Sequence, residues 1–162
     1  MSGPVVVGTD GTVHSDAALR FAAREALLRG SELIVVFSYV GPIDPDVDDF
    51  ETPKSVQIRR HEPEAIGALV RALDLPRSAL PAHRVVCDDL EASTLLVRAS
   101  IGNGAELIVI GQHYRHLLDR LVHGPSRASK LARRSHVPVV VVPEPDPAAG
   151  SLDAGHAAAA GQ

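Results

Sequence analysis

Two glycine-bearing segments hold the residues best suited to contact a ligand. The first runs from Gly8 to Thr12 and contains Asp10, whose carboxylate accepts hydrogen bonds from the hydroxyl or amino groups of a ribose or a base. The second begins at Gly111, where the missing Cβ lets the backbone approach a ligand closely. Ser38 adds a hydroxyl at the end of another apolar run. These residues predict a binding crevice if their segments converge.

A basic stretch that follows Gly111 has the chemistry to bind an anion. A short helix-like segment begins near Ser126, just after Gly124, and the free N–H groups at the start of a helix attract negative charge. The stretch contains six basic residues and a single acid, Asp119. Two interpretations of these basic residues are open. Their side chains hold phosphates, or they form a solvated helix face with a basic loop, which is the more usual role of such charges. The residues are Arg115, Arg120, Arg127, Lys130, Arg133 and Arg134.

Patterns typical of catalysis and metal binding are missing from the sequence. His113 and His116 have the spacing of a helical metal pair, but apart from Asp119 no nearby Cys, Asp or Glu completes a site, so surface histidines are the favoured interpretation and no metal is predicted. No Ser-His-Asp elbow, Walker loop or dinucleotide fingerprint occurs. We therefore predict no catalytic residue and no enzyme. Cys87 is predicted to be a small core residue rather than a reactive thiol.

The elements that must position these residues are read from five short apolar runs. Most of these runs are continuous rather than alternating, which is typical of strands covered on both faces, as in parallel sheets. β-branched residues dominate them, and Gly, Pro or Asp bounds them. The predicted strands are Val5–Val7, Leu33–Tyr39, Arg84–Val86, Leu107–Ile110 and Val137–Val142.

Amphipathic segments alternate with the strands and predict helices. Ser15 is the expected N-cap of the first and Gly30 its C-terminal stop, while Pro63 is expected in the first turn of the second. Alternating strands and helices imply a doubly wound α/β domain, in which ligands bind outside the carboxyl ends of the strands. The predicted helices are Ser15–Leu28, Pro63–Leu73, Leu90–Ile101 and Ser126–Arg134.

Two segments depart from this pattern. Residues 41–52 carry five acids and no bases, which predicts a mobile acidic loop. Residues 144–162 are rich in Pro, Ala and Gly, so we expect a domain over residues 1–143 followed by a disordered tail.

Composition narrows the possible partners. The net charge of −4 and the aromatic content of 3% argue against nucleic-acid binding. No apolar run approaches the ~20 residues needed to cross a bilayer, and the first residues lack the features of a secretory signal. With the lone Cys87, these features predict a cytoplasmic protein without membrane or nucleic-acid partners.

Three segments resemble the universal stress protein family in order and spacing. The opening VVVGTDGTVHSDAAL is similar to its first strand and turn, "V-G-x-D-G-S" followed by "S-x-x-A-L". Residues 104–111, GAELIVIG, resemble its fourth strand, "G-A-D-L-I-V-x-G", and residues 137–143, VPVVVVP, its closing "C-P-V-L-V-V-P". The resemblance covers residues 4–143 except residues 41–62.

This resemblance implies the fold, the assembly and the site residues. The fold would be a five-stranded parallel sheet of order 3-2-1-4-5, with the Rossmann-like, adenine-nucleotide α-hydrolase-like architecture. The assembly would be a homodimer paired through the edge of the strand at 137–142, which would otherwise be an exposed edge. The positions that match the family's nucleotide contacts are Asp10, Ser38, Gly111, Gly124 and Ser126.

The family's glycine motif for ATP, G-x-x-G, nine residues and G-[S/T], is only partly present. Gly111 and Gly124 match two glycines, but Tyr114 replaces the other, and Pro125 replaces the Ser or Thr, with Ser126 one residue late. The tyrosine adds a side chain and the proline removes an N–H donor. Losing two charge-assisted hydrogen bonds would weaken phosphate binding by roughly 10²–10⁴-fold.

The sequence therefore predicts a regulator of the stress-protein type that binds ATP weakly or not at all and signals through dimerisation or partner contact. The alternative is a genuine ATP- or AMP-binding member, with or without slow hydrolysis, in which Arg115, Arg120 or Arg127 replaces the lost backbone donors.

Overall fold

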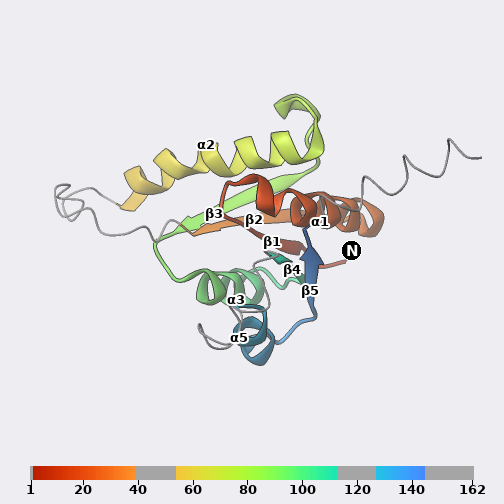
Figure 1. Ribbon diagram of the computed structural model, residues 1–162, viewed down its shortest axis with the longest axis vertical. Helices are drawn as coiled ribbons and strands as arrows, with labels where there is room; N and C mark the ends of the chain where they lie inside the picture. The colour runs from red at the N-terminus through yellow and green to blue at the C-terminus, as the bar shows by residue number, and fades with distance from the viewer. Residues whose placement is uncertain (1, 39–53, 113–126, 145–162) are drawn as a thin grey trace, which may run out of the picture.

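The computed structural model describes residues 2–38, 54–112 and 127–144, which form one parallel sheet with helices on both faces (Figure 1). The strand order is β3-β2-β1-β4-β5, which confirms the predicted order 3-2-1-4-5. All pairings are parallel; Val6 in the central strand, for example, aligns with Ile34 on one side and Ile108 on the other. The strands are β1 (Val5–Thr9), β2 (Leu33–Ser38), β3 (His83–Asp88), β4 (Leu107–Gln112) and β5 (Val139–Pro143).

The central strands are covered on both faces, as their continuous apolar runs predict. Val5 and Val7 pack into the core cluster beneath α1 (Asp16–Arg29) and α2 (Lys54–Leu73). Val6 packs into a second cluster beneath α3 (Ala92–Gly102) and α5 (Arg127–Arg134). Successive side chains of a strand point to opposite faces, so one run of valines supplies both cores. Two short 3-10 turns, η1 (Val13–Ser15) and η3 (Arg77–Ala79), complete the described elements.

The first predicted helix is confirmed, although its N-cap behaves differently. Gly30 ends α1 in the left-handed conformation at φ +60°, and its N–H donates to the carbonyls of Ala26 and Leu27. Ser15 occupies the N-cap position without a side-chain cap hydrogen bond. Its hydroxyl donates instead to the carbonyl of Thr12, which fixes the turn before the helix.

The predicted start of the second helix is wrong. α2 begins at Lys54, and Pro63 lies inside it rather than in its first turn. Pro63 is exposed, so water can satisfy the carbonyl that its missing N–H leaves without a partner in the helix. Beyond it, Ile66 and Leu69 are buried on the sheet, as the apolar pattern predicts.

Parts of the sequence that carried predictions lie outside the described residues. They are the acidic loop 41–52, Gly124 and Ser126 with the basic stretch before α5, and the tail 144–162 except Glu144. Among the described helices, none is long and apolar enough to cross a membrane.

Candidate functional site

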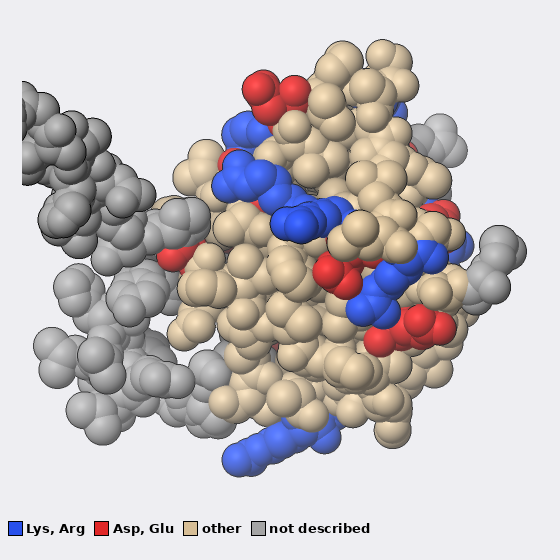
Figure 2. Space-filling view, turned by 90° about the vertical axis from the view of Figure 1, so that its right-hand side faces the viewer, with Lys and Arg blue, Asp and Glu red and all other residues tan. Residues whose placement is uncertain are grey.

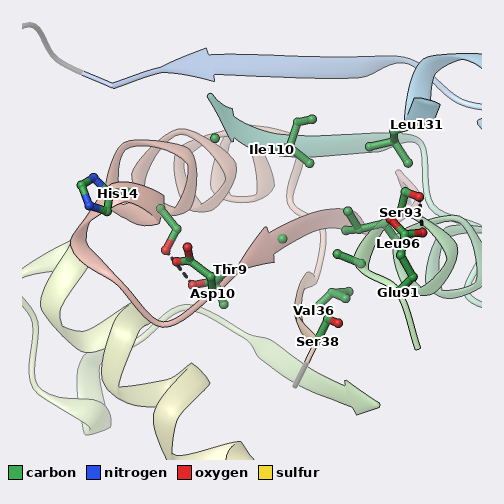
Figure 3. A pocket seen from close by; sticks show the side chains of 14 residues that line it. Thr9, Asp10, His14, Val36, Ser38, Glu91, Ser93, Leu96, Ile110 and Leu131 are labelled. Atoms are coloured by element: carbon green, nitrogen blue, oxygen red, sulfur yellow. Dashed lines mark hydrogen bonds between the residues drawn. The ribbon is translucent and has the colours of Figure 1, made fainter. Parts of the chain in front are cut away.

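A cavity of about 460 Å³ opens at the carboxyl ends of β1, β2 and β4, on the side of the sheet covered by α3 and α5 (Figure 3). The end of β1 contributes Thr9 and Asp10, and Gly111 lies at the end of β4. Ser38 reaches it from β2. The turn that follows β1 and the carboxyl end of β4 therefore converge at one mouth, as the rule for open parallel sheets requires.

The β1 turn is held by a chain of hydrogen bonds that ends on a carbonyl. The Gly11 amide donates to Thr9 Oγ1 at 3.0 Å, and Thr9 Oγ1 lies 2.7 Å from Ser15 Oγ. Because Ser15 Oγ donates its proton to the Thr12 carbonyl at 2.9 Å, the Thr9 hydroxyl must be the donor to Ser15. Gly11 has a φ of +79°, a conformation that glycine adopts without strain. The turn is therefore built before any ligand arrives.

Asp10 lies at the tip of this turn and is exposed. Its Oδ1 accepts hydrogen bonds from the Thr12 amide at 3.0 Å and from Thr12 Oγ1 at 2.7 Å. These two bonds orient the carboxylate at the rim of the cavity, where Figure 3 shows it beside Thr9. A carboxylate only accepts hydrogen bonds, so it suits ligand groups that donate, such as hydroxyls or amines.

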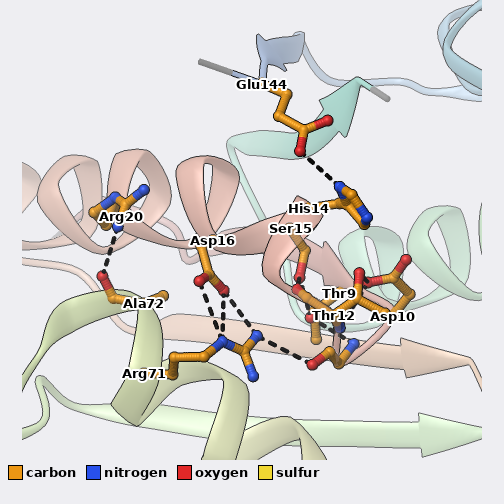
Figure 4. Close-up of polar contacts among 11 residues, drawn as sticks. Thr9, Asp10, Thr12, His14, Ser15, Asp16, Arg20, Arg71, Ala72 and Glu144 are labelled. Atoms are coloured by element: carbon orange, nitrogen blue, oxygen red, sulfur yellow. Dashed lines mark hydrogen bonds and ion pairs between the residues drawn. The ribbon is translucent and has the colours of Figure 1, made fainter. Parts of the chain in front are cut away.

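An ion pair behind the turn ties it to α2 (Figure 4). The guanidinium of Arg71 contacts both carboxylate oxygens of Asp16, with the shortest distance 2.8 Å from Nη2 to Oδ1. The same Nη2 donates to the Gly11 carbonyl at 3.0 Å. The hydrogen bond to Asp16, which is 9% exposed, raises the pKa of Arg71 above its ordinary value. The cation is thus permanent and holds the start of α1 and the Asp10 turn together.

Ser38 lies at the cavity, but its proton is already used. The hydroxyl donates to the carbonyl of Leu90 at 2.6 Å and so links the end of β2 to the segment before α3. A ligand can still find an acceptor in this oxygen, since a hydroxyl has two lone pairs.

Gly111 makes a close backbone contact that the sequence did not suggest. A Cβ at this position would lie 3.3 Å from the carbonyl oxygen of His14 and 3.8 Å from the Cα of Ser15. The glycine therefore lets β4 pass close to η1 and the start of α1. Its place at the cavity is as expected, but the close approach that the structure shows is to the protein's own backbone.

Glu91, Ser93 and His14 also line the cavity and were not predicted. Glu91 and Ser93 belong to the start of α3, which follows the carboxyl end of β3. Ligands bind outside the carboxyl ends of the strands in an open parallel sheet, and this rule selected the segments after the first and fourth strands. It applies equally to the segment after the third strand and would have found Glu91 and Ser93. His14 has no such signal; its Nδ1 lies 2.6 Å from Glu144 Oε1, across 130 residues of chain.

Cys87 is buried in the core, in agreement with its prediction. Burial, together with the nearby carboxylates of Glu62 and Glu64, raises the pKa of its thiol to about 11. A thiol with such a pKa is almost entirely protonated at neutral pH and therefore a poor nucleophile. Within the described ranges, no three His, Cys, Asp or Glu side chains are grouped to hold a metal ion.

Comparison with known proteins assigns the chain to a family. The model of the universal stress protein family matches residues 1–143. The chain belongs to the universal stress protein family. Its relative Universal stress protein Rv2005c from Mycobacterium tuberculosis is 33% identical over an alignment of 148 residues, and the match covers 88% of this chain and 48% of the relative. The chain thus spans about half the length of the curated relatives it matches.

Solved universal stress proteins share the fold. One from Burkholderia pseudomallei is 25% identical with a TM-score of 0.58, over 87% of this chain and 96% of that one. Another, solved in complex with cAMP, is 25% identical with a TM-score of 0.55, over 88% of this chain and 98% of that one. The family and the fold class predicted from the three sequence segments are confirmed.

Proposed function

We propose that this universal stress protein is a non-catalytic, cytoplasmic regulator whose crevice receives the adenosine part of an adenine nucleotide and binds ATP weakly or not at all. The observation that carries the proposal is the use of hydrogen-bond donors at the crevice. The hydroxyls of Ser15 and Ser38 donate to backbone carbonyls. The amides of Gly11 and Thr12 donate to side chains of their own turn. None of these four donors reaches a phosphate without losing a bond within the protein.

The adenosine part has a better partner. The Asp10 carboxylate is held at the rim of the crevice and accepts hydrogen bonds from ribose hydroxyls or an amino group. Val36, Leu96 and Ile110 provide apolar surface within the same cavity, against which a planar base can pack. The solved relative in complex with cAMP supports an adenine ligand for this fold.

Residue types elsewhere in the chain support weak phosphate binding. Tyr114 and Pro125 replace a glycine and a Ser or Thr of the family's ATP motif, and both replacements remove backbone access or a donor. The proposed contacts thus remain Asp10, Ser38 and Gly111 with Gly124 and Ser126, of which the last two lie outside the described residues.

Calorimetric titration with adenosine, AMP and ATP tests this proposal. We expect adenosine to bind, and Asp10→Asn to weaken it about tenfold, because the variant loses a charge-assisted acceptor but keeps Oδ1 for Thr12. The matched control is Asp74→Asn, on the turn after α2, which does not line the cavity. Gly111→Ala is less informative, because the added methyl meets the His14 carbonyl. No heat from any adenine compound at millimolar concentration would overturn the adenosine site.

The alternative is a genuine ATP- or AMP-binding protein, with or without slow hydrolysis, and the relative in complex with cAMP is the observation that favours it. Arg115 or Arg120 of the stretch before α5, or Arg127 at its first residue, would then hold the phosphates. A micromolar dissociation constant for ATP in the same titration selects this alternative and rejects weak binding.

The proposed partner is a second copy of the chain, paired through the edge strand at 137–142. β5 is the last strand of the sheet, and its valines are half-buried. Val140 and Val142 pack on one core and Val139 on the other, whereas Val141 belongs to neither described cluster. The face in Figure 2 carries acidic and basic side chains interspersed among uncharged ones, which suits a protein partner better than nucleic acid.

Light scattering after size exclusion tests the dimer. Val141→Lys places a charge on the pairing edge and is expected to convert a dimer into a monomer. Val13→Lys makes the same change at a residue that is already 62% exposed and should leave the mass unchanged. A monomeric wild-type protein at high concentration would overturn the dimer.

A further inference from the structure

The start of α3 places a carboxylate at the crevice. Glu91 is the N-cap residue of this helix, and both Glu91 and Ser93 line the cavity (Figure 3). A helix N-terminus at a ligand pocket ordinarily attracts an anion, because its free N–H groups and its dipole carry partial positive charge. Here the protein supplies that anion itself.

The carboxylate is held firmly in this position. Glu91 Oε2 accepts hydrogen bonds from Ser93 Oγ at 2.5 Å, from the Thr94 amide at 3.2 Å and from Thr94 Oγ1 at 3.3 Å. The bond from Ser93, with further bonds from Thr94, keeps the pKa of the Glu91 carboxyl below its ordinary value. Glu91 therefore remains negative at neutral pH.

Among the residues that the structure describes, the charges that line the cavity do not compensate for this anion. Among the described lining residues the acids are Asp10 and Glu91, and His14 is the sole basic side chain, already in contact with Glu144. Arg134 on α5 reaches Thr94 Oγ1 at 3.3 Å, but it does not line the cavity, and within the described ranges it forms no ion pair with Glu91.

We propose that Glu91 is a specificity-determining residue of the crevice: its carboxylate occupies the positive end of α3 and repels the phosphates of a nucleotide, so that ligands are discriminated by their phosphate charge. This inference rests on the proposed adenosine site and adds a charge-based selection to it. The chemical class it favours is the nucleoside or the monophosphate over the triphosphate. If Glu91 only capped α3, its substitution would instead change the affinities for adenosine, AMP and ATP by the same factor.

The test compares Glu91→Gln with wild type in calorimetric titrations with adenosine, AMP and magnesium-free ATP. Glutamine keeps an acceptor for Ser93 and Thr94 but removes the charge. We expect the affinity to rise about fivefold for ATP and about twofold for AMP, and to stay constant for adenosine, as repulsion between charges near a protein surface predicts. Added NaCl should narrow the difference between variant and wild type, because salt screens the repulsion.

Two controls separate charge at the site from other effects. Glu106→Gln removes the same charge at the residue before β4, away from the cavity, and should leave all three affinities unchanged. Glu91→Asn removes the charge with a residue that is itself a preferred N-cap, so it provides a folded variant if glutamine destabilises α3.

The outcomes distinguish this inference from the proposed function. Equal gains for the three ligands, or no gain for ATP in either variant, would overturn the role of Glu91 while leaving the adenosine site intact. An absence of binding by wild type and variants alike would overturn both. A gain that increases with the number of phosphates supports the inference.

Discussion

The two walls of the crevice are built from contacts of different range. The β1 turn, with Asp10 at its tip, is tied to α2 by Arg71, which lies 55 residues from Asp16 and 60 from Gly11 in the chain. The start of α3 is stabilised within four residues, by the bonds that Ser93 and Thr94 make to Glu91. Both walls hold a carboxylate at the cavity.

This difference indicates which wall depends on the packed fold. A local cap persists as long as its helix does, whereas the β1 turn needs α2 to lie against α1 in addition to its own hydrogen bonds. Arg71 is the described link between them at the turn, and Arg20 adds a hydrogen bond to the Ala72 carbonyl at 3.4 Å. Substitutions at the two walls should therefore differ in how much stability they remove and in how far from the substituted residue their effects extend.

Arg71→Ala should have the largest effect. It leaves the carboxylate of Asp16, 9% exposed, without its cation and removes the bond to the Gly11 carbonyl, so we expect a loss of about 2 kcal/mol in the free energy of unfolding. The matched control is Arg84→Ala, which breaks the exposed pair with Glu32 and should cost less than about 1 kcal/mol. Urea unfolding followed by circular dichroism measures both. Equal losses would show that the Arg71 pair adds nothing beyond a surface ion pair.

The rate at which Cys87 is labelled should also differ between substitutions at the two walls. The thiol is buried in the cluster beneath α1 and α2 and its pKa is raised to about 11, so wild-type protein should react slowly with a disulfide reagent at neutral pH. Loosening α2 by Arg71→Ala should accelerate the reaction by up to about thirtyfold, the equivalent of 2 kcal/mol. Glu91→Asn, on the other wall, should leave the rate as it is. Equal acceleration by both variants would contradict independent walls.

Thr9→Val tests the hydrogen-bond chain within the β1 turn. The variant keeps the shape of the side chain but leaves the Gly11 amide without its acceptor, and we expect a loss of about 1 kcal/mol in the free energy of unfolding. Thr12→Val is the control, since its hydroxyl bond to Asp10 is exposed and should be worth less than about 0.5 kcal/mol. Thermal unfolding measures both losses of stability. A larger loss for Thr12→Val than for Thr9→Val would show that the hydrogen bonds through Thr9 do not stabilise the turn.

Glu91 should have the smallest effect on stability, and that effect should depend on pH. Its folded-state pKa is lowered, so the charged form adds stability above the unfolded value of about 4.3, and this stability is lost as the pH falls through the folded value. Glu91→Gln should therefore destabilise the protein slightly at pH 7, by at most about 1 kcal/mol, and have less effect near pH 3. A difference that grows on acidification would show that the hydrogen bonds do not favour the carboxylate.

Much of the fold could be predicted because its signals are local. Continuous runs such as Leu33–Ser38 require cover on both faces, and the alternation of runs with amphipathic segments leaves few topologies. The strand order and the assignment of the family came from the resemblance of three segments. α2 was misplaced at its start because Pro63 was read as a beginning, although an exposed proline is tolerated inside a helix.

The site was predicted less completely, since a residue's partner is not a local property. Asp10, Ser38 and Gly111 were expected at the cavity and lie there. The sequence did not show that the Ser38 proton is used by Leu90, or that the close approach at Gly111 is to His14.

The sequence alone determined that a parallel sheet forms and that turns bearing Asp10 and Gly111 meet at its carboxyl edge. That conclusion needs only the spacing of apolar residues and the direction of parallel strands. The tertiary structure decided which donors are already used, that Arg71 braces the β1 turn and that Glu91 brings a second carboxylate to the cavity. Those contacts join side chains from separate elements, and their partners are defined only once the helices are packed on the sheet.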